Sequence, residues 1–198
     1  SALFDVADRL VFTTQPSATA GAGTAFATQP VVAVRAGASN TAVNDQGTVV
    51  VLSIKAGTGT SGALLTCDGG LSKTVTNGVA IFSGCKIDKI SPTSPANPYK
   101  IVAAAINLTA AESTNVTITA GAAAKLGFTA QPNAGVASQA FPIQPVVAVQ
   151  DAGGNTVTTG TNSTATVTLS LGAGAPVGAV LTCSGGLSKA AVAGLATF

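Results

Sequence analysis

Short apolar stretches separated by Gly, Asn and Pro recur along the whole chain. Val49–Lys55 (VVVLSIK) has the β-branched run of a buried strand, whereas Tyr99–Ala104 and Asn115–Ala120 alternate between apolar and polar residues. Turn residues return about every 8 to 12 positions, which is typical of antiparallel sandwiches, and no stretch has a helical period. The pattern therefore predicts an all-β fold of antiparallel β-sandwiches, with about eight strands in each.

The expected strands lie between clear turn signals. Asn77-Gly78 is the strongest hairpin signal, because both residues tolerate a positive φ. Residues 15–23 and 36–47 are expected to be loops, and the three prolines of Ser91–Pro98 exclude a central strand there. The expected strands are Arg9–Gln15, Pro30–Arg35, Val49–Lys55, Ala63–Cys67, Ser72–Thr76, Val79–Ser83 with an extension at Cys85–Ile87, Tyr99–Ala104 and Asn115–Ala120.

The second part of the chain repeats the first. Leu10 and Phe12 match Leu126 and Phe128, and Cys67 matches Cys183, each at an offset of 116 residues. Single-residue slips in this offset fall in expected loops, where insertions are tolerated. Because 116 residues is the size of a domain, the sequence predicts tandem domains at 8–121 and 122–198.

Two segments of the chain do not belong to a complete copy of the repeat. Phe198 matches Phe82, so residues 83–121 have no counterpart in the second domain, which is expected to be incomplete. Either the chain is a fragment of a longer polypeptide, or another chain completes it. Residues 1–7 line up with Thr117–Ala123 and are expected to be the end of a preceding repeat, or a donor strand that uses Leu3, Phe4 and Val6.

Charge is scarce in this chain. Charged residues make up 8% of the sequence, against about a quarter in typical domains, and the net charge is +2 without a basic cluster. That distribution argues against a nucleic-acid partner. The apolar run Ile101–Ile106 is too short to span a membrane. Weak electrostatic repulsion suits association with copies of the same chain.

Three cysteines give one pair and one unmatched thiol. Cys67 and Cys85 flank the predicted hairpin and can meet if its strands pair, so we expect a disulfide that contributes about 3 kcal/mol. The partner of Cys183 would fall just beyond Phe198. A disulfide indicates an oxidising compartment, which here means the extracellular space or cell surface.

Catalytic chemistry has few candidates. The chain contains no His, which excludes Ser-His and Cys-His nucleophiles, and its acidic residues are scattered. We therefore expect no enzyme, no cofactor and no metal site. Asp45 with Asn44, and Asp151 with Asn155, could supply oxygen ligands to Ca²⁺, but turn formation is the simpler interpretation.

Three Asn-X-Thr or Asn-X-Ser triplets are candidate N-glycosylation sites. They begin at Asn107, Asn115 and Asn162. Attached glycans would offset the low surface charge.

The repeated phrases resemble a known family. Leu10–Pro16, Pro145–Val157, Ala165–Leu171 and Gly69–Gly84 are similar to the bacterial Ig-like (Big-type) repeats found in tandem in large secreted and cell-surface proteins. The resemblance implies tandem Ig-like sandwiches and no catalytic residues. It also implies a place in adhesin stalks, sheaths, surface layers or extracellular fibres.

Together these features predict a structural module of an extracellular filament, sheath or surface layer. The alternative is an adhesin stalk or a carbohydrate-binding or surface-binding module. A single Tyr and no Trp disfavour stacking on sugars.

Overall fold

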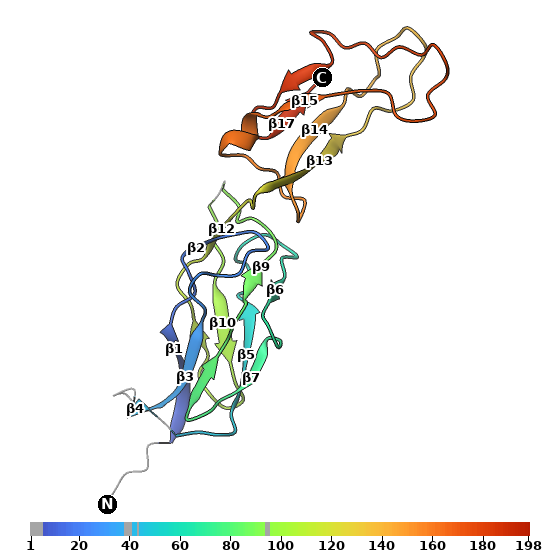
Figure 1. The fold of residues 1–198 in the computed structure, drawn as a ribbon. Helices are drawn as coiled ribbons and strands as arrows, with labels where there is room; N and C mark the ends of the chain where they lie inside the picture. The colour runs from blue at the N-terminus through green and yellow to red at the C-terminus, as the bar shows by residue number, and fades with distance from the viewer. Residues whose placement is uncertain (1–5, 38–40, 43, 94–95) are drawn as a thin grey trace, which may run out of the picture. The chain divides into compact units, whose positions relative to one another are not determined.

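The computed structural model describes residues 6–37, 41–42, 44–93 and 96–198, and over these residues the fold is all-β (Figure 1). The described part contains no α-helix, and its one 3-10 helix, η1, covers Thr161–Thr164. No helix in these ranges is long and apolar enough to cross a membrane. The chain divides into two compact units, Ser1–Thr119 and Ala120–Phe198, called unit 1 and unit 2 below.

Unit 1 contains two four-stranded antiparallel sheets. In the first, β3 pairs on one edge with β1 and on the other with β4 and β8. The second has the order β11-β10-β5-β7. Their bounds are β1 (Ala7–Thr14), β3 (Val31–Ala36), β4 (Thr41–Ala42), β8 (Val79–Ile81), β5 (Val49–Ile54), β7 (Ser72–Thr74), β10 (Ile101–Ala104) and β11 (Ala111–Glu112).

Two smaller pairs complete unit 1. β6 (Leu65–Thr66) pairs antiparallel with β9 (Lys86–Ile87), and β2 (Thr19–Gly21) pairs parallel with β12 (Thr117–Thr119). The prediction of loop over residues 15–23 was wrong at β2. Its Thr-Ala-Gly sequence is too short to show alternation, and the pairing is provided by β12, about a hundred residues away in sequence.

Alternating residues of both four-stranded sheets form one core. Successive side chains of a strand point to opposite faces of the sheet, so every second residue points into the core. The core members on these strands are Leu10, Phe12, Val32, Val34, Val50, Leu52, Ala80, Ile101 and Ala103. The core also contains three fully buried side chains that lie outside the strands of these two sheets, namely Tyr99, Phe82 and Ile87.

The turn at Asn77-Gly78 differs from the predicted hairpin. Both residues have positive φ, 50° and 73°, and Thr76 and Val79 bridge across them. The flanking strands then separate, because β7 pairs with β5 in one sheet and β8 pairs with β3 in the other. A turn signal predicts the local reversal but not which sheet each strand joins.

Unit 2 repeats part of this arrangement. β14 (Val146–Asp151) pairs with β13 (Ala123–Ala130) and with β17 (Leu195–Thr197), while β15 (Thr166–Thr168) pairs with β16 (Ser188–Ala190). The β13–β14 register repeats that of β1–β3, and both ladders have register shifts at corresponding places. The core of unit 2 is small and comprises Val147, Val149, Val157, Val167, Ala191 and Ala196.

Candidate functional site

The disulfide of unit 1 joins Cys67 and Cys85. β6 pairs with β9 through Leu65↔Ile87 and Thr66↔Lys86, so the two cysteines occupy the next opposed positions of the same ladder. Asp68 continues the ladder by donating its N–H to the Ser83 carbonyl at 2.8 Å. The β6–β9 pairing therefore brings the thiols together, rather than pairing of the strands that flank Asn77-Gly78.

A loop on the other side holds the strand that contains Cys85. Phe26 N–H donates to the Cys85 carbonyl at 2.8 Å, and Gly23 N–H donates to the Ile87 carbonyl at 2.8 Å. Gln29 completes this side, because its Oε1 accepts the Cys85 N–H at 2.8 Å while its Nε2 donates to the Phe26 carbonyl at 2.6 Å. Residues 84–87 thus lie between β6 and the Gly23–Gln29 loop.

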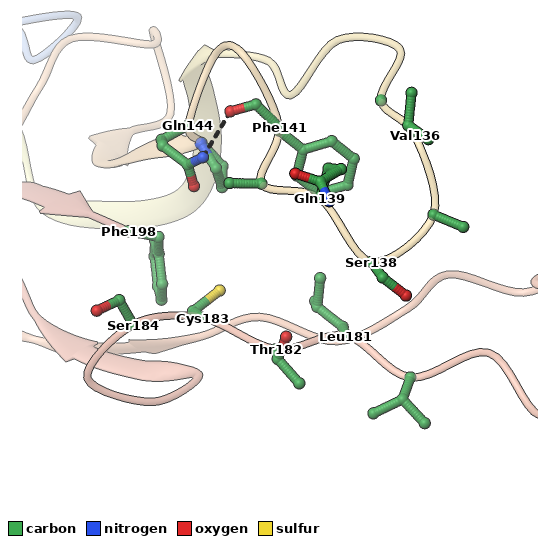
Figure 2. A pocket seen from close by; sticks show the side chains of 15 residues that line it. Val136, Ser138, Gln139, Phe141, Gln144, Leu181, Thr182, Cys183, Ser184 and Phe198 are labelled. Atoms are coloured by element: carbon green, nitrogen blue, oxygen red, sulfur yellow. Dashed lines mark hydrogen bonds between the residues drawn. The ribbon is translucent and has the colours of Figure 1, made fainter.

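The corresponding place in unit 2 is a hollow of about 590 Å³ (Figure 2). One wall is the loop Gly135–Gln144, and the opposite wall includes Val180–Ser184. These walls align with the Gly23–Gln29 loop and with β6 in unit 1, since Gln144 matches Gln29 and Cys183 matches Cys67. Gln144 keeps the local bond of its counterpart, with Nε2 donating to the Phe141 carbonyl at 2.6 Å.

Cys183 carries a free thiol and lines this hollow. Its side chain is partly accessible, and Figure 2 shows it beside Leu181, Thr182 and Ser184 on the wall that faces the Phe141 loop. Its expected partner beyond Phe198 stays a prediction.

Apolar side chains that are buried in unit 1 are exposed at matched positions of unit 2. The exposed fraction rises from 3% at Leu10 to 56% at Leu126, and from 8% at Phe12 to 47% at Phe128. Phe26 is 3% exposed, whereas its counterpart Phe141 is 37% exposed.

The three sequons all begin with exposed asparagines. Asn107 has a φ of 61° in the turn between β10 and β11, and Asn115 lies just before β12. Asn162 lies in η1. The asparagine side chains of all three are therefore open to solvent, and their glycosylation stays a prediction.

The candidate Ca²⁺ ligands are engaged in turns. The Asp45 carboxylate accepts hydrogen bonds from the N–H groups of Gly47 and Thr48, at 2.7 and 3.0 Å, and from the Thr48 hydroxyl. These hydrogen bonds lower the pKa of Asp45, and the bond from the Thr48 hydroxyl has the largest effect. Among the described residues there is no cluster of three or more His, Cys, Asp or Glu that could hold a metal ion.

Asp151 organises the equivalent turn of unit 2. It is almost fully buried and accepts from Gly121 N–H at 3.0 Å and from Asn155 N–H at 2.8 Å, and also from Asn155 Nδ2. Burial by itself raises the pKa of Asp151, but the hydrogen bonds from Asn155 and Gly121 outweigh it, and the pKa is lowered overall.

The proposed donor strand is largely outside the described residues. Leu3 and Phe4 fall there, while Val6 is described and is 79% exposed.

Sequence reasoning missed the role of Gln29 and Gln144. The signal was present, because a Gln-Pro pair precedes the repeated Val-Val-Ala-Val in both copies. Its meaning depends on the fold, which places Gln29 against the backbone of Cys85.

No family model, curated protein or solved structure matches the chain. The function is therefore inferred from the geometry of the two units.

Proposed function

We propose that the chain is a structural repeat module of an extracellular filament, sheath or surface layer, built from tandem bacterial Ig-like β-sandwiches. The observation that carries this proposal is the repeated register of β1–β3 and β13–β14, including the positions of its irregularities. Repetition of one scaffold at domain length is how extended extracellular proteins gain length without new chemistry.

The chemistry of the chain supports a structural role. There is no His to act as a base, and the carboxylates of Asp45 and Asp151 are committed to turns. The Cys67–Cys85 disulfide supports an extracellular location, because such bonds persist in oxidising compartments. Tyr99, the one tyrosine, is fully buried and is not available to stack on a sugar, which favours the structural role over carbohydrate binding.

Electron microscopy of the native material tests the proposal. We expect regular fibres or sheets whose repeat distance matches one or two domain lengths. Separate strings of domains without lateral or end-to-end order would overturn it and favour the adhesin stalk.

A further inference from the structure

The first and last segments of unit 1 lie side by side and run in the same direction. β1 bridges Thr109 in parallel at Arg9, and β2 pairs in parallel with β12 (Figure 1). Residues 8–22 are called the first segment below, and residues 109–119 the last segment. The other strand pairs in the described part of unit 1 are antiparallel, so the parallel contact distinguishes this junction from the rest of the unit.

Hydrogen bonds join the two segments at three successive places. At the first place, Leu10 N–H donates to the Thr109 carbonyl, and Thr109 N–H donates to the Asp8 carbonyl, both at 2.9 Å. At the second, Thr114 N–H donates to Oε1 of Gln15 at 2.9 Å. At the third, the three residue pairs of the β2–β12 ladder are flanked by two further backbone bonds of 2.8 Å. The bonds are therefore distributed along both segments.

Gln15 supplies the bond between the two parallel backbone contacts. β1 ends at Thr14, and Pro16 has no N–H to donate, so a backbone donor is lost at this point of the first segment. The partly buried side chain of Gln15 provides an acceptor for Thr114 N–H instead. A single side chain thus connects the β1 contact to the β2 contact.

The shared direction of the segments decides how these bonds respond to a pull on the chain. Tension on the N-terminal side draws the first segment back toward Ala7, and tension on the C-terminal side draws the last segment forward beyond Thr119. Because the segments are parallel, the two pulls are opposed along one axis, and the segments must slide past each other. Hydrogen bonds between strands lie across the strand direction, so sliding loads all of them together. An antiparallel pair pulled at its open end would instead lose its bonds one at a time.

We propose that this junction is a mechanical clamp that enables unit 1 to bear tension along the chain. The inference rests on the proposed structural role, because a module that joins its neighbours along the chain transmits load between them. Unit 2 begins at Ala120, directly after β12 ends at Thr119, so tension carried through unit 2 reaches the last segment of the clamp first.

Force spectroscopy of the full chain, held by handles at its two ends, tests the clamp. The lifetime of folded unit 1 is measured at constant force. Its unfolding step is identified by the disulfide, because reduction should lengthen that step by the 18-residue separation of Cys67 and Cys85, about 6 nm. The step from unit 2, whose Cys183 is free, should not change on reduction.

Two glutamines provide a matched pair of variants. Gln15→Ala should shorten the lifetime of unit 1 under tension about fivefold, as expected for one hydrogen bond that is broken in the transition state. Gln29→Ala is the control, because Gln29 is also partly buried, also precedes a proline, and also accepts a backbone N–H through Oε1, from Cys85 at 2.8 Å. Gln29 lies outside the clamp, so its replacement should leave this lifetime unchanged.

A third variant and an equilibrium measurement separate the clamp from a general loss of stability. Gln15→Glu keeps an acceptor for Thr114 N–H and should retain the lifetime of the unmodified protein. Tyr99 is the one tyrosine of the chain, so its fluorescence in urea reports the unfolding of unit 1. Gln15→Ala and Gln29→Ala should both lower the urea midpoint, because each leaves a backbone N–H without its acceptor. Only Gln15→Ala should also shorten the lifetime under tension, because forced unfolding is governed by the unfolding rate.

Equal shortening of the lifetime by Gln15→Ala and Gln29→Ala would overturn the clamp, and so would a Gln15→Ala variant as long-lived as the unmodified protein. A Gln15→Glu variant as short-lived as Gln15→Ala would exclude the Thr114 bond as the source of the effect and would also overturn it. Any of these results in a protein that forms fibres or sheets rejects this inference alone. The expected lifetimes in a protein without fibres or sheets reject the proposed function alone.

Discussion

At the residue scale, the best-defined packing constraint is between Gly59 and Tyr99. The Tyr99 side chain is fully buried, and its hydroxyl donates to the Lys89 carbonyl at 3.0 Å. Gly59 has a φ of 67°, and a Cβ placed on it would overlap the Tyr99 ring. The glycine is therefore required both by the backbone and by the lack of space.

Gly59→Ala should destabilise unit 1 strongly. A positive φ costs an alanine about 1 kcal/mol, and forcing a methyl group against a buried ring adds about 1–3 kcal/mol. Gly57→Ala is the control, because Gly57 has a φ of 77° but open space around its Cβ position. Urea denaturation should give a larger loss for Gly59→Ala, and equal losses would contradict the packing described.

Asp151 sets a pH dependence for unit 2. Its pKa is lowered in the folded state, so its contribution to stability is fully present above the ordinary Asp pKa of about 3.9 and is lost as pH falls through the folded value. Unit 2 should therefore lose stability below about pH 4.

Asp151→Ala should cost about 1–3 kcal/mol at neutral pH, because it leaves Gly121 N–H and the Asn155 amide without their acceptor. The difference in unfolding free energy between this variant and the unmodified protein should shrink as the pH falls below about 4. Denaturation followed at the Gly121 amide by NMR measures the loss at neutral pH and its change on acidification. A difference that is constant with pH would exclude the carboxylate as its source.

At the scale of elements, the disulfide supports one of the three two-residue pairings in the described part of unit 1. β6 and β9 contribute two residue pairs, to which Cys67–Cys85 adds a covalent cross-link. Reduction, or replacement of both cysteines by Ser, should lower the free energy of unfolding by about 2–4 kcal/mol. Cys183→Ser should have no such effect in urea denaturation, and a matching loss in that variant would show that the effect is not due to the cross-link.

The matched phenylalanines give a second comparison. Phe12→Ala should cost about 3–5 kcal/mol because the ring is buried in the unit 1 core. Phe128→Ala should cost much less, since its ring is half exposed in unit 2. Similar losses from the two substitutions in the full chain would contradict the difference in exposure between Phe12 and Phe128.

Much of the strand pattern could be predicted from periodicity. Strands with several alternating core residues, such as β3, β5 and β10, lie where the sequence predicts them. The described part of unit 1 has twelve strands rather than about eight. β2, β4 and β11 fall in predicted loops or connections, and β9, predicted as an extension of the Val79–Ser83 strand, is a separate strand that pairs with β6. Strands of two or three residues carry no period and depend on a partner far away in sequence.

The candidate site was less predictable. The pairing of Cys67 with Cys85 was predicted from spacing, but the reason given, a hairpin at Asn77-Gly78, was wrong because β7 and β8 join different sheets. The roles of Gln29 and Gln144 depend on which loop faces the cysteine strand. That arrangement is a property of the tertiary fold and not of local sequence.

At the scale of the whole molecule, unit 1 acts as an internal reference for unit 2. The two units share the register of their first ladder, while the matched side chains Leu10 and Leu126 differ in exposure from 3% to 56%. The central claim is that unit 2 repeats the scaffold of unit 1, with the Leu126 N–H unpaired among the described residues.

Backbone amide hydrogen exchange of the full chain tests that claim most directly. The Leu10 amide should exchange slowly because it donates to the Thr109 carbonyl, whereas the Leu126 amide should exchange fast. Amides within the two ladders, such as those of β3 and β14, are the controls and should both be protected. Equal, strong protection of Leu10 and Leu126 in the isolated chain would contradict the account.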